Sequence, residues 1–146
     1  MTQGKVLEIH IYSQPRSPAT SLPEVEAMAG VGLRGDHPRK ERRHLTLLSN
    51  EAWDQALAEM GDDLPACTRR ANLVVEGIDL RQTIGKRLLI GEVETLVLAE
   101  TQPCDLMEQQ RAGLRAALTP EMRGGVNGTI EVGGTIRVGD AVSVCE

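Results

Sequence analysis

The stretch LLIGEVETLVLA, residues 88–99, contains two runs of apolar and β-branched residues separated by Gly91. Such runs favour strands, and a glycine between them favours a turn, so we predict strands at 88–90 and 92–99. Short apolar segments between turn residues recur on both sides of this stretch. They do not alternate regularly with helices, which makes a doubly wound α/β sheet a poor fit. The sequence predicts a mainly β fold.

Further strands are expected on either side. In the N-terminal strand, Leu7, Ile9 and Ile11 alternate with polar residues and should share the buried face. At the C-terminus, a Gly139-Asp140 pair between two apolar runs predicts a two-residue hairpin turn. The predicted strands outside the central pair cover residues 5–12, 44–48, 72–76, 135–138 and 141–144, and Val126, Ile130 and Val132 share the parity of a further strand.

Residues 13–36 are rich in Pro, Ser and Gly and are predicted to form a long loop. A helix should begin at Ser49 or Asn50 and end at Gly61, with an apolar stripe at the i, i+3, i+4, i+7 spacing. A second helix, capped by Asp105, should cover residues 105–118. We therefore expect one domain, residues 1–146, built as a closed or nearly closed β-barrel with two or three inserted helices.

Composition excludes several classes of function. The formal net charge is −5, and the chain has no Phe, one Trp and one Tyr, which argues against nucleic-acid binding. No apolar run is long enough for a membrane helix and no signal peptide is visible, so a cytoplasmic location is expected. Two basic clusters stand out on this acidic chain and would suit a small anionic ligand: Arg39, Lys40, Arg42 and Arg43, and Arg69 with Arg70.

Three widely spaced cysteines form no C-x-x-C pair, so we expect neither disulfides nor a zinc site. Cys104 lies between a predicted strand and a predicted helix, where free backbone N–H groups can stabilise a thiolate. It is either a reactive thiol or a half-buried, inert one. Cys67, close to two arginines, is a weaker candidate, and Cys145 is penultimate.

Three short segments could bind an anion. Arg123-Gly124-Gly125 combines a planar cation with backbone that a ligand can approach closely, although a glycine pair also suits a bulge or a tight turn. Arg69, Arg70 and Asn72 lead into a strand and could serve the same ligand or form a solvated loop. Asp36 and His37 could place a carboxylate and an imidazole at a pocket rim, or simply face solvent.

Taken in order, these features resemble the MOSC family, the domain named for the C-terminal part of molybdenum cofactor sulfurases. The resemblance implies a barrel like the pyruvate kinase β-barrel, and a cysteine at the position of Cys104 that carries persulfide sulfur or ligates molybdenum. The matching segments are GLRGDH (32–37), LTLLS (45–49), RANLVVEGIDL (70–80), TQPC (101–104), GLR (113–115), RGGV (123–126) and GGTIRVGD (133–140).

The resemblance implies a short stand-alone member that uses molybdopterin, with a sulfur donor or a molybdoenzyme as partner. Pyridoxal phosphate is associated with the family through the desulfurase domain of full sulfurases, to which no segment here is similar. Two alternatives remain at this point: a non-catalytic module that binds a phosphorylated or oxyanionic small molecule, and detoxification of N-hydroxylated bases with a partner reductase. Whether the protein turns over a substrate is left open.

Overall fold

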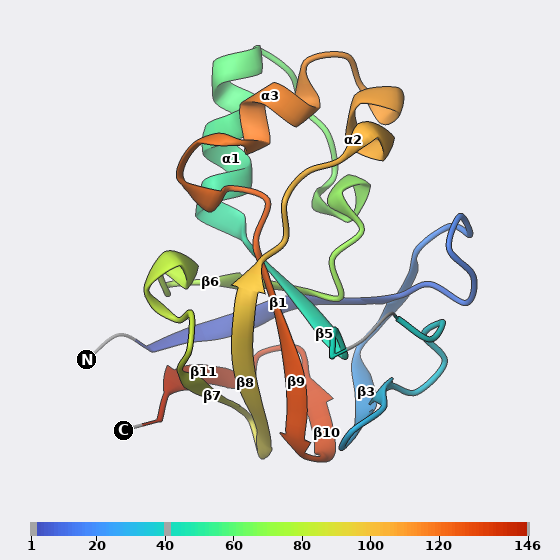
Figure 1. Ribbon diagram of the computed structural model, residues 1–146, viewed down its shortest axis with the longest axis vertical. Coiled ribbons are helices and arrows are strands. Elements are labelled where there is room, and N and C mark those ends of the chain that lie inside the picture. Colours follow the sequence, from blue (N-terminus) through green and yellow to red (C-terminus); the bar gives the residue numbers. More distant parts are fainter. Residues whose placement is uncertain (1–2, 40–41, 146) are drawn as a thin grey trace.

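The computed structural model describes residues 3–39 and 42–145, so Lys40 of the predicted basic cluster lies outside the described residues. Seven strands form a closed barrel in the order β11-β7-β8-β9-β5-β6-β1, and pairing of β11 with β1 closes it (Figure 1). The barrel strands are β1 (Gln3–Ile11), β5 (Leu45–Ser49), β6 (Leu73–Glu76), β7 (Arg87–Ile90), β8 (Val93–Glu100), β9 (Val126–Val132) and β11 (Ala141–Val144).

The predicted central pair of strands is confirmed. β7 and β8 are antiparallel neighbours, with Ile90 opposite Val93 across the turn at Gly91. The other barrel pairings are also antiparallel except β5–β6, which are parallel. A parallel pair needs a long crossover, and the chain supplies one that contains the first helix. The prediction of a closed, mainly β barrel is therefore correct.

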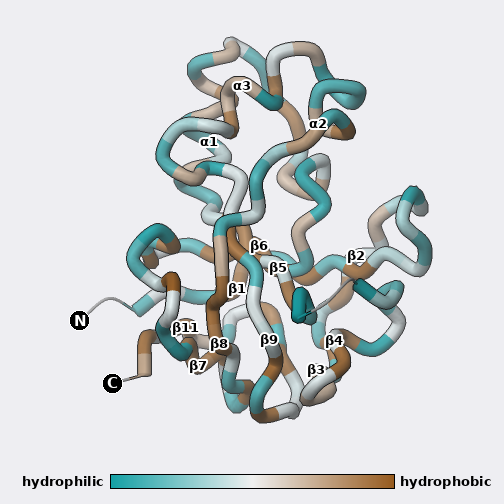
Figure 2. The backbone as a smooth tube through the Cα atoms, viewed as in Figure 1, coloured by the Kyte–Doolittle hydropathy of each residue, from teal (hydrophilic) through white to brown (hydrophobic). Residues whose placement is uncertain are grey.

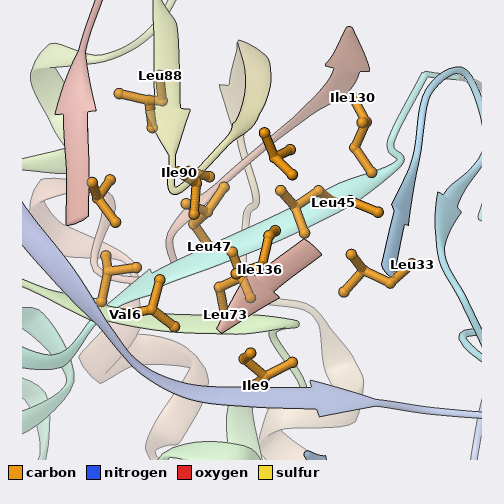
Figure 3. Packing of buried hydrophobic residues seen from close by; sticks show 14 of the residues in the cluster. Val6, Ile9, Leu33, Leu45, Leu47, Leu73, Leu88, Ile90, Ile130 and Ile136 are labelled. Atoms are coloured by element: carbon orange, nitrogen blue, oxygen red, sulfur yellow. The ribbon is translucent and has the colours of Figure 1, made fainter. Parts of the chain in front are cut away.

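Apolar side chains fill the barrel interior (Figure 3). Val6 and Ile9 from β1 are buried there, together with Leu45 and Leu73 from β5 and β6. The predicted inward face of β1 is only partly right. The register of β1 against β6 shifts between Val6 and Glu8, and this bulge moves Val6 rather than Leu7 into the core.

A small second sheet corrects two predictions. β3 (Glu24–Met28) pairs with β4 (Gly32–Leu33) and with β10 (Gly134–Arg137), so residues 13–36 are not one long loop. β10 and β11 flank a tight turn but do not form the predicted hairpin. The Asp140 carboxylate accepts the Arg137 N–H within the turn, and the two strands then join different sheets. A short strand, β2 (Thr20–Leu22), extends the barrel sheet beside β1.

The helices lie at one end of the barrel (Figure 1). The predicted first helix is confirmed as α1 (Asn50–Met60): Ser49 caps it by accepting the Ala52 N–H, and Gly61 ends it in the left-handed conformation. The predicted single second helix is instead two short helices, α2 (Asp105–Gln110) and α3 (Leu114–Leu118). The break comes at Arg111, whose extended backbone (φ −157°, ψ 119°) ends α2, and Gly113, with φ of 92°, then begins α3 as its N-cap.

A second apolar cluster joins the helices to the outside of the barrel. Trp53 and Leu57 of α1, with Leu114 and Leu118 of α3, pack over Val74 of β6. Figure 2 shows hydrophobic segments alternating with hydrophilic ones along α1, α2 and α3, as expected for helices with one buried face. None of the helices in the described ranges is long and apolar enough to cross a membrane.

Candidate functional site

A cavity of about 210 Å³ lies beside the start of α2. Its walls come from the loop between β1 and β2, the loop before β5 with Thr46 of β5, the 3₁₀ turn η1 (Ala66–Arg69) with the residues after it, the connection from β8 to α2 with the first turn of α2, and Gly124 before β9. Its lining residues are Pro15, His37, Arg39, Thr46, Arg69, Arg70, Ala71, Thr101, Cys104, Leu106, Met107 and Gly124.

Cys104 lies at the rim of this cavity with an exposed side chain. Its backbone is extended (φ −123°, ψ −175°), and its carbonyl accepts the Met107 N–H at 3.0 Å, so Cys104 is the residue that caps α2. The expectation that Asp105 would be this cap is wrong, because the Asp105 carboxylate instead pairs with Arg115 of α3. The Cys104 thiol is thereby left accessible beside the cavity.

Arg69 is the most deeply buried cation of the cavity, with 7% of its surface exposed. Its Nε donates to the Gly124 carbonyl at 2.9 Å and its Nη2 to the Thr101 carbonyl at 2.8 Å. Burial lowers the pKa of Arg69 below its usual value, while the negative charges of Cys104 and Glu100 act in the opposite direction. Among the described residues, Arg69 forms no ion pair with a carboxylate.

Arg70 is held differently. It caps η1 in the left-handed conformation, with φ of 66°. Its Nη1 donates to the Ser17 carbonyl at 2.8 Å and its Nη2 to the Pro15 carbonyl at 3.0 Å. Its guanidinium stacks over the Tyr12 ring, 4.3 Å from the centroid, and burial raises the pKa of the Tyr12 phenol well above its usual value.

Asp36 and His37 contribute in different ways. The Asp36 carboxylate is buried, accepting the Tyr12 N–H at 2.9 Å and Arg39 Nε at 3.0 Å. It therefore holds Arg39 against the cavity without lining the cavity itself. His37 does line it, with Nδ1 3.0 Å from the Pro38 carbonyl. Arg39 was noted in the sequence only as part of a basic cluster; the signal that it belongs to the site is its i+3 spacing from Asp36.

Besides Asp36, three other predicted site residues do not line this cavity. Asn72 is fully buried. Its side-chain oxygen accepts hydrogen bonds from the Thr46 N–H and hydroxyl, and its side-chain nitrogen donates to the His10 carbonyl. Gly125 is packed against β5: a Cβ added there would meet the Leu47 carbonyl oxygen at 2.2 Å.

Arg123 lies on the opposite side of the same backbone. Its guanidinium forms a bidentate ion pair with the Glu59 carboxylate of α1, with N···O distances of 3.0 and 2.8 Å. Arg123 lines a different cavity. The expected convergence of Arg123 with Arg69 and Arg70 is therefore wrong. Only Gly124 of that segment reaches the site, where its carbonyl holds Arg69.

The charge of the cavity follows from these placements. Its described lining contains Arg39, Arg69, Arg70 and His37 but no Asp or Glu. Such a lining attracts anions, and guanidinium groups suit phosphate-like and carboxylate groups in particular. Among residues 3–39 and 42–145, no group of three or more His, Cys, Asp or Glu side chains could hold a metal ion. The expectation that the protein binds no zinc stays a prediction.

Comparison with known proteins supports the same family and fold. The sequence matches the MOSC domain family model over residues 34–143. Among solved structures, the YUAD protein from Bacillus subtilis superposes with a TM-score of 0.82 at 19% identity, covering 99% of this chain and 98% of that chain.

YiiM from Geobacillus stearothermophilus gives a TM-score of 0.78 at 17% identity, over 98% of this chain and 75% of that chain. YiiM from Escherichia coli gives 0.74 at 15% identity, over 100% and 70% of the two chains. At these identities the structures establish a shared fold. A search of curated proteins found no match.

Proposed function

Because the chain belongs to the MOSC domain family, we propose that it handles sulfur for the molybdenum cofactor, with Cys104 as the working thiol. In this role the thiolate carries a persulfide sulfur or ligates molybdenum. The observation that carries the proposal is the placement of one exposed thiol at a cavity whose described charged lining is entirely cationic. A persulfide is an anion at neutral pH, and a soft thiolate is a suitable ligand for a soft metal centre.

The chemistry of sulfur uptake fits the site. A Cys104 thiolate attacks the outer sulfur of a donor persulfide, forming a new S–S bond. The donor's own S–S bond breaks, and its electron pair leaves with the donor thiolate. No external oxidant or reductant is required, because one persulfide replaces another. Arg69 supports this step because its buried charge, held by two backbone carbonyls, lies close enough to attract negative charge on Cys104.

The donor set also fits a molybdopterin group. Cys104 would supply the sulfur ligand, and Arg69, which forms no ion pair among the described residues, would bind the cofactor's phosphate. When bound, the group would supply a molybdenum centre that accepts sulfur. A cavity of about 210 Å³ is smaller than the sites that enclose whole drug-sized ligands, so it would hold one end of such a molecule.

One separate observation is also compatible with the alternative, a pure anion-binding module. Arg69 is positioned by backbone carbonyls alone, so its geometry does not depend on Cys104. A protein that only binds an oxyanion would need these arginines and not the thiol. The possibility of a detoxifying activity with a partner reductase stays a prediction from the family.

The two functions are separated by a sulfur-loading experiment. Purified protein is incubated with glutathione persulfide, and the intact mass is measured before and after reduction. We expect a reducible gain of one sulfur atom in the parent protein and in Cys67→Ser, the matched control, and no gain in Cys104→Ser. Phosphate or molybdate binding, measured by calorimetry, should be similar in all three proteins. Loading that persists in Cys104→Ser would refute the sulfur-carrier proposal, whereas anion binding without any loading would establish the binding module.

A further inference from the structure

The loop between β1 and β2, residues 12–19, forms one wall of the cavity that contains Cys104. Its tip is closed on itself: Ser17 Oγ donates to the Gln14 carbonyl at 3.0 Å and accepts the Gln14 N–H at 3.1 Å. Pro15 from this tip lines the cavity, although the loop itself is largely exposed. In Figure 1 the loop, in blue, projects sideways from the barrel below α2.

Arg70 ties the loop tip to the body of the protein. Its two terminal nitrogens donate to the Pro15 and Ser17 carbonyls at 3.0 and 2.8 Å, which lie 55 and 53 residues away along the chain. The Tyr12 ring supports the guanidinium from one face at 4.3 Å. A planar fork that is stacked on an aromatic ring and bound to two carbonyls is fixed in position, unlike a lysine ammonium.

The backbone of Arg70 indicates that this side chain is needed. With φ of 66°, the residue has the left-handed conformation, which glycine adopts without strain and other residues adopt at a cost. An arginine at this position bears that cost, and its side chain satisfies the two loop carbonyls and stacks on Tyr12.

We propose that Arg70 is a positioning residue that holds the loop tip of residues 14–17 against the cavity, so that this loop sets the size of molecule that reaches Cys104. Because the Cys104 thiol is exposed at the rim, the limit applies to molecules that must occupy the cavity to react: while Arg70 holds the loop, a small donor fits there and a bulky one is obstructed by the wall that Pro15 belongs to. Loss of the two hydrogen bonds from Arg70 to the loop widens the cavity without changing the Cys104 thiol itself. The inference takes this cavity as the site of the proposed function, but it concerns access and not sulfur chemistry.

Alkylation of Cys104 by reagents that differ in size and charge tests the proposal. The probes are iodoacetamide, iodoacetate and a bulky pyrene maleimide, with labelling at Cys104 quantified by peptide mapping. In Arg70→Ala, the ratio of maleimide to iodoacetamide rates should rise about tenfold, because two hydrogen bonds from a cation are lost. The matched control is Arg34→Ala, which removes an arginine that is 70% exposed and paired with Glu26 on β3. Its ratio should equal that of the parent protein.

A second variant separates the effect of the Arg70 hydrogen bonds to the loop from the effect of its positive charge. Arg70→Lys keeps the cation but not the planar fork, so the preference for iodoacetate over iodoacetamide should stay near the parent value while the bulky maleimide reacts faster. Cleavage by trypsin after Arg16, in the loop tip, gives an independent readout and should accelerate in Arg70→Ala. An unchanged size ratio and unchanged cleavage in Arg70→Ala would overturn the proposal. Failure of Cys104 to accept sulfur would refute the proposed function and leave the size ratio unaffected.

Discussion

Replacing Gly125 by alanine should destabilise the barrel strongly, because this glycine packs against the backbone of β5. Gly125 has φ of +96°, and its Cβ would lie 2.2 Å from the Leu47 carbonyl oxygen and 3.2 Å from the carbonyl carbon. Leu47 pairs with Val126 across β5 and β9, so relief of this overlap requires two barrel strands to separate. No side chain can move aside, because the obstructing atoms belong to the backbone.

The expected magnitude has two parts. The left-handed backbone costs a non-glycine residue about 1–2 kcal/mol. Overpacking a buried position costs about 1–3 kcal/mol more. The total of about 2–5 kcal/mol corresponds to a fall in Tm of roughly 5–15 °C for a chain of this size.

Gly139→Ala is the matched control. Gly139 has φ of +95°, almost the same as Gly125, but nothing lies within 4 Å of its added Cβ. It should therefore show only the conformational part, about 1–2 kcal/mol. Thermal unfolding followed by circular dichroism, with urea titration as a second measure, gives both values. Equal losses of stability in the two variants would refute the packing argument. A loss of anion binding in Gly125→Ala at unchanged stability would instead indicate that this segment binds an anion.

Three further predictions follow from the site and its surroundings. With limiting iodoacetamide near neutral pH, Cys104 should be labelled before the two half-buried cysteines, and protection of Cys104 in the ligand-free protein would show it to be a packed thiol. Arg123→Met should cost about 1–3 kcal/mol of stability in urea unfolding while phosphate binding stays within about twofold of the parent value; a large loss of binding would place Arg123 in the site after all. The hydrogen bond from Arg123 holds the pKa of Glu59 below its usual 4.5, so this contribution to stability is present above about pH 4.5 and is lost as the pH falls through the folded-state pKa. Glu59→Gln should therefore lose less stability on acidification than the parent, and identical acid profiles would contradict this.

The sequence predicted those parts of the fold that depend on neighbouring residues. The turn at Gly91 between two apolar runs, and the caps Ser49 and Gly61 around α1, are local signals with a direct physical cause. The errors arose where partners are distant. The turn at Gly139-Asp140 exists, yet the strands that flank it pair with β3 and β1, and no local pattern states which neighbour a strand will choose.

Two missed features did have local signals. Glu24-Val25-Glu26-Ala27 alternates polar and apolar residues as a half-buried strand does, and the surrounding glycines and prolines obscured it. The predicted helix at 105–118 breaks at Arg111, and Gly113 two residues later caps the next helix. A glycine inside a helical pattern makes a continuous helix less favourable, so Gly113 was the local signal for the break. The bulge in β1 had no such signal, because it depends on how β6 lies beside that strand.

The site shows the same division between local and distant information. Cys104 could be singled out because its position between a strand and a helix is a local property, and the structure places it at the rim of the cavity. Arg69 and Arg123 are equally basic in the sequence, yet Arg69 faces the cavity and Arg123 faces Glu59 of α1.

The difference arises at residues 123–125, where consecutive residues contact different parts of the protein. Arg123 contacts the helices, the Gly124 carbonyl accepts a hydrogen bond from Arg69, and Gly125 packs on β5. A short segment that separates two environments cannot be assigned to one of them from its composition. The two arginines are distinguished by what their guanidinium groups bind, a carboxylate for Arg123 and backbone carbonyls for Arg69. Arg69, which forms no ion pair with a carboxylate among the described residues, is the one of the two that can attract an anion beside Cys104.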